Sequence, residues 1–350
     1  MDQLHESSQG IFEPFGHSTM TKTYCRTFVL AVAALIGLGL GPAAKADIFH
    51  ILIMMEGSST QHQPQINGLR DGLEELRYAE GENLNWRQID GRTQEELRAN
   101  LKARLEKQRV DVIVALGTAE TIIAKEIAPQ IPTVFLPAAD PVKSGFVRSL
   151  ANPGTNLTGL SFFMGSESVG KQLEVFKQFV PELRKVGVVF DSRLKSTGLN
   201  DSWNRLNAVA SWLGLDLTEQ PVISTAEASR KILSLPRSGT SVGVFVFCSG
   251  LFKSLDELAR VATKQKLPLF GCNAFQVAEQ NVLISYAPDL YSLGYRGAWF
   301  VDRIFKGTKP QNLPVETPRK FELVVNNKIA GEIGLKIPPG MLMLADRVFR

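Results

Sequence analysis

Small polar side chains, many of them with a hydroxyl group, follow most of the short apolar runs in this sequence. Hydroxyl groups and the N–H groups at helix starts bind anions such as a carboxylate, and an Asp beside them suits an ammonium group. Ala119, at a predicted helix start, and Phe163, which could stack on a ligand, join this set. The candidate ligand-binding residues are Ser58, Ser59, Thr60, Thr118, Ala119, Asp140, Phe163, Asp191, Ser192, Ser249, Asn273 and Tyr286.

Each of these residues also has a structural interpretation. Ser, Thr and Asn are the ordinary helix N-caps, so any one of them alone is more often structural. Asp140 precedes Pro141 and could equally form a turn, and Phe163 could equally pack against a hinge.

Motifs for catalysis are absent from the sequence. The G-x-S-x-G match at 239–243 precedes an apolar run instead of following one, so it is not a nucleophile elbow. The sequence contains no G-x-x-x-x-G-K-[ST] loop, no G-x-G-x-x-G, no Cys-x-x-Cys and no His-x-x-x-His. These absences argue against acyl transfer, nucleotide hydrolysis, dinucleotide binding and a metal site. We therefore expect a binding protein with no catalytic residue, no metal and no cofactor.

The stretch from Asp111 to Pro141 shows which elements position these residues. Two apolar runs, Val112–Leu116 and Pro132–Leu136, flank an amphipathic stretch with Ala119, Ile122, Ile123 and Ile127 at helical spacing. This is a β-α-β unit, and strands so uniformly apolar belong to a parallel sheet covered on both faces. Ligands in such sheets bind beyond the carboxyl ends of the strands, here at 117–119 and 138–140.

The same plan recurs after residue 163, so the sequence predicts an α/β protein with two doubly wound parallel-sheet lobes. We expect three hinge crossings, near Phe163, Pro288 and Gln311. The first lobe then comprises 47–162 with 288–311, and the second comprises 163–287 with 312–350. Several hinge strands favour closure of the two lobes around a ligand.

The N-terminal 46 residues read as an export signal. Lys22 and Arg26 precede the apolar run Phe28–Leu40, and an Ala-x-Ala pattern ends at Ala46. The run is too short to span a bilayer comfortably, although an uncleaved anchor is the alternative. Residues 1–19 precede an otherwise ordinary signal, which makes Met20 the candidate start. We expect cleavage near Ala46 and a periplasmic mature protein.

Composition supports a soluble protein of two domains: 350 residues, 44% hydrophobic and 21% charged. The net charge of +4 is small and unclustered, so nucleic acid is not an expected partner. Cys248 and Cys272 follow strands that would be neighbours, at matching ends. A disulfide could join them in an oxidising compartment, but we expect two buried thiols, because bridges between adjacent parallel strands are uncommon.

Several stretches together resemble the bacterial ABC-transporter substrate-binding proteins of the tryptophan/tyrosine-importer (TrpX-like) type. The most specific are the block AADPVKSGFVRSLANPGTNLTGL and the tail PVETPRKFELVVN, with DVIVALGT, KQLEVFKQFVPELRKVGVVFDS and LPLFGCNAF between and before them. The resemblance covers nearly all of the chain after residue 46. It implies a type I periplasmic-binding fold and delivery of a small solute to a membrane permease.

The resemblance also carries over to particular residues. Thr118 and Ala119 match the family's first-lobe helix start, Asp140 its Asp-Pro turn, and Asp191 with Ser192 its second-lobe turn. Asn273 stands where we expect relatives to place Asp. The function predicted is the solute-binding component of an ABC importer, acting as a monomer on an amino acid or related carboxylate. A sensory-input protein and an exported hydrolase are the alternatives.

Overall fold

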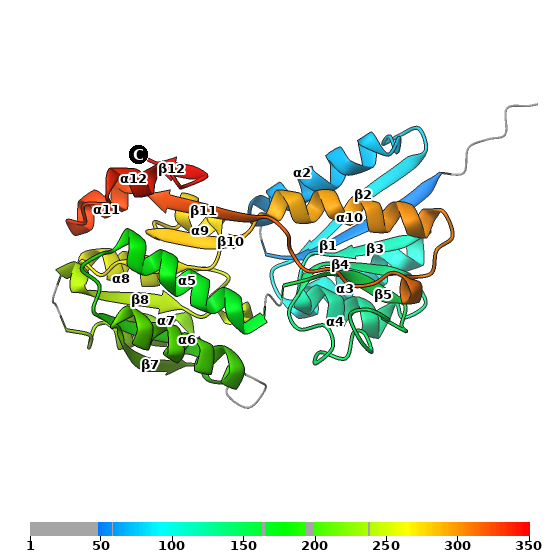
Figure 1. Cartoon of the computed structure of the whole chain (residues 1–350). Helices are drawn as coiled ribbons and strands as arrows, with labels where there is room; N and C mark the ends of the chain where they lie inside the picture. Colours follow the sequence, from blue (N-terminus) through cyan, green and yellow to red (C-terminus); the bar gives the residue numbers. More distant parts are fainter. Residues whose placement is uncertain (1–47, 58, 163–164, 194–198, 237–238) are drawn as a thin grey trace, which may run out of the picture. The chain divides into compact units, whose positions relative to one another are not determined.

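The computed structural model describes residues 48–350 apart from 58, 163–164, 194–198 and 237–238. The described residues form one compact unit with two β-sheets, each covered by helices on both faces (Figure 1). The predicted signal segment, Ser58 and Phe163 lie outside the described residues, and Ser59 is described only as the first residue of a helix. No described helix combines the length and apolarity needed to cross a bilayer.

The first lobe has a five-stranded parallel sheet in the order β2-β1-β3-β4-β5. The two strands with mixed or shorter apolar patterns, β2 and β5, lie at its edges. Its elements are β1 (Phe49–Glu56), α2 (Ser59–Glu75), β2 (Leu84–Gly91), α3 (Gln94–Lys107), β3 (Val112–Ala115), α4 (Thr118–Ile127), β4 (Thr133–Ala138), β5 (Leu157–Ser161) and α10 (Leu290–Phe305).

Alternate side chains of the central strands enter two separate cores. Ile51 and Ile53 of β1 pack with α2 and α10, whereas Leu52 and Met54 pack with α3 and α4. Because both faces are covered, every central position is apolar, which is the pattern that the sequence predicted. Helices α2 and α10 touch closely at Gly294, where a Cβ would collide with the backbone carbonyl of Gln65. This contact fixes the helix that carries His62.

The second lobe has a seven-stranded sheet in the order β12-β11-β10-β9-β8-β6-β7. Its elements are α5 (Gly165–Phe179), β6 (Lys185–Asp191), α6 (Leu199–Leu213), β7 (Asp216–Val222), α7 (Thr225–Ile232), η2 (Gly239–Ser241), β8 (Val242–Val246), η3 (Gly250–Phe252), α8 (Asp256–Lys264), β9 (Leu269–Gly271), α9 (Ala274–Glu279), β10 (Ile284–Pro288), β11 (Phe321–Asn326), α11 (Asn327–Ile333), α12 (Pro339–Leu342) and β12 (Arg347–Phe349).

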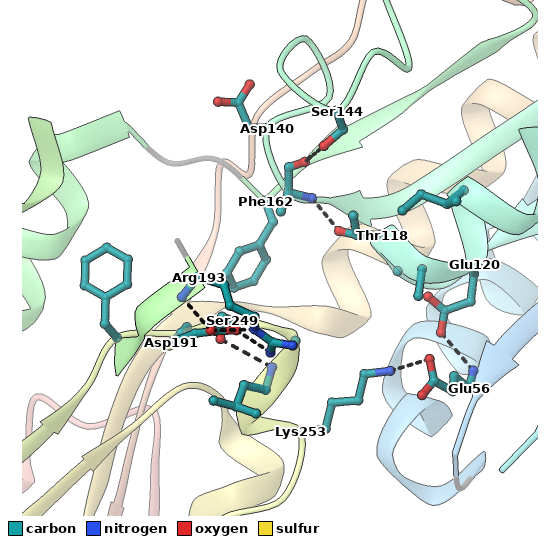
Figure 2. Close-up of a pocket in the computed structure, with 18 of the residues that line it drawn as sticks. Glu56, Thr118, Glu120, Asp140, Ser144, Phe162, Asp191, Arg193, Ser249 and Lys253 are labelled. Atoms are coloured by element: carbon teal, nitrogen blue, oxygen red, sulfur yellow. Dashed lines mark hydrogen bonds and ion pairs between the residues drawn. The ribbon is translucent and has the colours of Figure 1, made fainter. Parts of the chain in front are cut away.

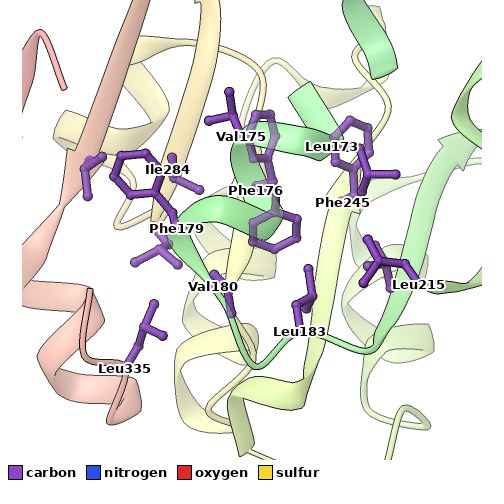
Figure 3. Close-up of a cluster of buried hydrophobic side chains, with 14 of the residues drawn as sticks. Leu173, Val175, Phe176, Phe179, Val180, Leu183, Leu215, Phe245, Ile284 and Leu335 are labelled. Carbon is purple, nitrogen blue, oxygen red and sulfur yellow. The ribbon is translucent and has the colours of Figure 1, made fainter. Parts of the chain in front are cut away.

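The core beneath α5 shows how the second sheet is held (Figure 3). Leu173, Phe176 and Phe179 of α5 are buried against Phe245 of β8 and Ile284 of β10. The other face of the same strands packs with α7, α8 and α9. The sheet is therefore sandwiched between helices like the first one, and the predicted two-lobe α/β fold is confirmed.

The chain passes between the sheets three times: between β5 and α5, between β10 and α10, and before β11. We expected the third crossing near Gln311, but the chain leaves the first lobe later. Val315 packs in a first-lobe core, and Glu316 pairs with Leu160 of β5. The return starts β11 where β10 ends, with Phe321 opposite Pro288, so β11 runs antiparallel to β10.

Candidate functional site

A cavity of about 880 Å³ lies where strands of both sheets end. From the first lobe it is lined by the residues after β1, β3 and β4, and from the second by those after β6 and β8. The carboxyl ends of parallel strands are where ligands bind in α/β sheets, as expected from the sequence. Figure 2 shows polar and charged side chains entering this space from both lobes.

Five of the predicted residues meet in this cavity: Thr118, Ala119, Asp140, Asp191 and Ser249. Four others lie elsewhere among the described residues. Thr60 is exposed on α2, Ser192 follows Asp191 without entering the lining, and Asn273 and Tyr286 have structural roles.

The structural roles of Asn273 and Tyr286 are plain from their contacts. The Asn273 side chain accepts a hydrogen bond from the N–H of Gln276 at 3.0 Å and so caps α9. Tyr286 stacks on Phe321 with ring centroids 5.3 Å apart. The N-cap alternative therefore describes Asn273 in this structure, and the site proposed below includes neither residue.

The start of α4 forms one part of the first-lobe wall. Thr118 Oγ1 accepts a hydrogen bond from the N–H of Ala139 at 2.8 Å, which ties the turn after β3 to the turn after β4. The predicted apolar face of α4 is wrong in part: Ile122 is exposed and, with Ala119, lines the cavity, whereas Glu120 and Thr121 are buried. The first N–H groups of this helix lie beside the cavity, as an anion site requires.

The Asp140 side chain stabilises the turn that follows β4. Its Oδ1 accepts a hydrogen bond from the N–H of Lys143 at 3.1 Å, and its Oδ2 lies 3.4 Å from Lys143 Nζ. Its φ of 30° is unusual for a residue with a side chain. The carboxylate thus lines the cavity while already having a cation beside it.

Asp191 forms the matching point on the second-lobe wall. Its side chain is buried, and Arg193 grips it with two hydrogen bonds, Nε to Oδ1 at 2.8 Å and Nη2 to Oδ2 at 2.6 Å. These charge-assisted bonds hold the pKa of the Asp191 carboxyl below its usual value. Asp191 is therefore ionised and internally neutralised.

A disulfide joins Cys248 and Cys272, which corrects our expectation of two buried thiols. Strands β8 and β9 are adjacent and parallel, and the two residues beyond their ends have Cα atoms 5.4 Å apart, a normal spacing for a bridge. The bridge anchors the segment that follows β8, in which Ser249 Oγ accepts a hydrogen bond from the N–H of Leu251. Ser249 thus caps η3 at the cavity edge.

The sequence interpretation missed a cluster of charged residues in the cavity: Glu56, Glu120 and Lys253. The N–H of Glu56 donates to Glu120 Oε1 at 2.8 Å, and Glu56 Oε2 lies 2.8 Å from Lys253 Nζ. Figure 2 shows Lys253 reaching from the second lobe to Glu56 of the first. The cluster thus spans both walls.

Glu120 is the most deeply buried carboxylate of this cluster, at 3% exposure. Burial raises the pKa of its carboxyl, while hydrogen bonds from backbone N–H groups and the charge of Lys253 oppose that rise. Its carboxylate folds back over the start of α4 toward Gly117, where a Cβ would collide with Oε2. Gly117 also has a φ of 154°, which residues with a side chain rarely adopt, so the backbone favours glycine there, and a Cβ would in addition displace the Glu120 carboxylate.

His62 of α2 lies beside this cluster. Its Nδ1 is 3.4 Å from Gln65 Oε1, and Gln65 Nε2 donates to the carbonyl of Leu136 at 2.7 Å. Burial lowers the pKa of His62, so the ring is neutral near pH 7. Its contribution at that pH is a dipole and a hydrogen bond rather than a charge.

The remaining walls are largely apolar. Phe162, Phe247 and Leu251 line the cavity with Val169 and Ile122. A site with mostly apolar walls and a few placed polar groups is typical for a small organic molecule. In the described part of the chain, no group of three or more His, Cys, Asp or Glu is placed to hold a metal ion.

One signal could have revealed part of the missed cluster. Glu120 shares a helix face with Ala124 and Ile127, spaced by four and seven residues, so it is a charge on an apolar face. Nothing in the local sequence around Lys253 indicates that its ammonium group reaches Glu56.

The chain is similar to known proteins in sequence and in fold. A family model described as ABC transporter substrate binding protein matches residues 50–349. A tyrosine-binding protein of Clostridioides difficile (strain R20291) is 24% identical over 265 residues, covering 74% of this chain and 73% of that protein.

Two solved structures show a similar fold. An ABC domain from Streptococcus pneumonia in complex with L-Trp has a TM-score of 0.72 at 21% identity, covering 87% of this chain and 100% of that one. A conserved domain protein from Vibrio cholerae O1 biovar eltor str. N16961 has a TM-score of 0.73 at 23% identity, covering 86% and 100%.

Proposed function

The chain belongs to the family of ABC transporter substrate-binding proteins, and from this premise we propose that it captures an aromatic amino acid for import. The ligand binds in the cavity between the two lobes and passes to an ABC permease of the inner membrane. The protein works in the periplasm as a monomer, after removal of residues 1–46, and binds its ligand without chemical turnover.

The observation that carries the proposal is the lining of the cavity. Strand ends of both lobes supply it, its walls are mostly apolar, and charges of both signs enter it. Its volume of about 880 Å³ falls in the range of small-molecule sites and is ample for an amino acid with a ring. Closure of two lobes on such a ligand strengthens polar contacts by removing water.

The parts of the ligand match parts of the lining. The start of α4 at Thr118 and Ala119 offers backbone N–H groups to a carboxylate. Phe162 and Phe247 offer faces for an aromatic ring. The names of two similar proteins, one tyrosine-binding and one solved with L-Trp, favour the same ligand class.

A thermal-shift screen of the mature chain tests the proposal. We expect L-tyrosine, L-tryptophan or L-phenylalanine to raise the Tm in a concentration-dependent way, because a ligand at 100 times its Kd adds about 2.7 kcal/mol of stability. Sugars, purines and aliphatic carboxylates should have no comparable effect. A shift with sugars alone, or with no amino acid, would contradict the proposal.

A matched pair of variants locates the binding. Phe247→Ala removes an aromatic ring from the cavity wall and should weaken amino-acid binding in calorimetry by about tenfold or more. Trp212→Ala removes a ring that is 76% exposed on α6, outside the cavity lining, and should leave the affinity unchanged. Equal effects of the two variants would place the ligand elsewhere.

A further inference from the structure

The charged residues of the cavity pair up with one exception. Asp140 lies by Lys143, Asp191 is gripped by Arg193, and Glu56 is paired with Lys253. Glu120, also in the lining, has no ion pair of its own among the described residues. Glu120 is therefore a buried carboxylate that lines the cavity without a paired cation in the described part of the chain.

We propose that Glu120, assisted by Glu56, binds the ammonium group of the ligand, and that Lys253 occupies this place when no ligand is present. The inference rests on the proposed function and deepens it, because it assigns the ligand's amine to the first lobe. From the sequence, Asp140 and Asp191 were the candidates for that role, but both are already neutralised by a neighbouring side chain.

The geometry of Glu120 suits this role. Glu120 Oε1 accepts a hydrogen bond from the N–H of Glu56, and Glu120 Oε2 has no described hydrogen bond to another residue. Gly117 gives the carboxylate room to lie over the start of α4, at the cavity wall. The start of α4, which would bind the ligand's carboxylate, is therefore next to Glu120, which would bind its ammonium group. Such an adjacency suits two groups that are carried by one α-carbon.

The charge balance gives the ammonium a reason to bind there. A buried ionised carboxylate is costly unless a cation neutralises it. In the ligand-free protein the charge of Lys253 acts on Glu120 while its Nζ pairs with Glu56. The side chain of Lys253 is 41% exposed, so it can yield its place to a ligand amine by turning toward water. Lys253 then competes with the ligand's ammonium group for the carboxylates of Glu56 and Glu120.

Two ligand pairs test the inference: L-tryptophan with indole-3-propionate, and L-tyrosine with 3-(4-hydroxyphenyl)propionate. The members of each pair differ only in the amine. Calorimetry on the full mature chain should show that the wild type prefers the amino acid. Glu120→Gln should reduce this preference about tenfold or more, because it weakens the binding of the amino acid and leaves the affinity for the analogue unchanged.

Two further variants keep the test independent of folding. Lys253→Met alters a partly exposed side chain and should increase the preference for the amine, because the competing cation is gone. Glu126→Gln changes the same residue type on the exposed side of α4, outside the cavity, and should leave the preference unchanged. Circular dichroism and the Tm establish that each variant is folded.

The outcomes separate the two proposals. If the wild type binds no aromatic amino acid, the proposed function fails and this inference with it. If it binds one but Glu120→Gln keeps the wild-type preference, or Lys253→Met lowers it, only the assignment of the amine is overturned.

Discussion

The two walls of the cavity hold their buried carboxylates in opposite ways. Asp191 on the second wall is 5% exposed and forms two side-chain hydrogen bonds with Arg193, and its pKa is lowered. Glu120 on the first wall is 3% exposed, has no ion pair of its own with any residue that the structure describes, and its pKa is raised. The exposed fractions are similar, but only Asp191 has a described ion pair within its own lobe.

The same difference extends to the surrounding segments. Three contacts within the second lobe stabilise the second wall: the Cys248–Cys272 disulfide, the Asp191–Arg193 ion pair and the cap formed by Ser249. On the first wall, the cation that pairs with Glu56 and acts on Glu120 is Lys253, which comes from the opposite lobe. We therefore interpret the second wall as a support and the first wall as the side that binds the ligand's ammonium group. Four variants test this difference between the walls.

The largest effect should come from removing the disulfide. Cys248 and Cys272 are 24 residues apart, and a bridge closing such a loop contributes roughly 3 kcal/mol of stability. We expect Cys248→Ser with Cys272→Ser to lower the free energy of unfolding by about that amount in denaturant titrations. A reductant should destabilise the wild type similarly and leave the double variant unaffected. Equal stability of the two proteins would mean that the second wall does not depend on this tie.

Asp191→Asn should have the next largest effect. Losing the charge-assisted bonds to Arg193 should cost about 1–2 kcal/mol at pH 7, the modest range reflecting the 65% exposure of the Arg193 side chain. Because the folded pKa of Asp191 is lowered, its contribution is present above the unfolded value near 3.9 and disappears as the pH falls through the folded value. The gap between variant and wild type should therefore close in acid. A gap that persists below that range would exclude the ion pair as its cause.

The contrast between the walls also explains what the sequence could predict. The buried strands and their order along the chain follow from apolar runs, and the caps Thr93 and Ser224 follow from their spacing to Glu96 and Glu227. These are local patterns, which a sequence shows directly. Even a local pattern can mislead: Ser254 has the same spacing to Glu257, but α8 begins at Asp256 after Leu255.

The site was harder to predict, because its members are brought together by tertiary structure. Thr118, Asp140 and Asp191 were found since they follow strands directly. Arg193, the partner of Asp191, is only two residues further along the chain. Even so, the ion pair depends on side-chain conformations that the sequence does not show. The ion pair between Glu56 and Lys253 joins distant segments, and no periodicity predicts such a contact. Asn273 shows the opposite error, since a strand-end position turned out to be a helix cap.

Glu120→Gln should change stability in the direction opposite to Asp191→Asn. Since burial raises the folded pKa of Glu120, the wild type loses stability relative to the variant as the pH rises through that value. The ligand-free variant should be more stable by about 1 kcal/mol at pH 8, a gain of roughly 2 °C in Tm. Below the ordinary Glu pKa, the two proteins should melt together. A variant less stable than the wild type at pH 8 would show that Glu120 is satisfied internally, as Asp191 is.

Lys253→Met should have the smallest effect on the ligand-free protein. Its ion pair with Glu56 joins the two walls, but the side chain is 41% exposed, so water and salt weaken the attraction. We expect a loss of about 0.5 kcal/mol at low ionic strength that vanishes in 1 M NaCl. If Lys253 only holds the place of a ligand amine, a saturating amino acid should also remove the difference, because the ligand then neutralises both carboxylates. An amino-acid complex that still loses stability on this substitution would show that Lys253 and the ligand act side by side, and the first wall would then need two cations rather than one.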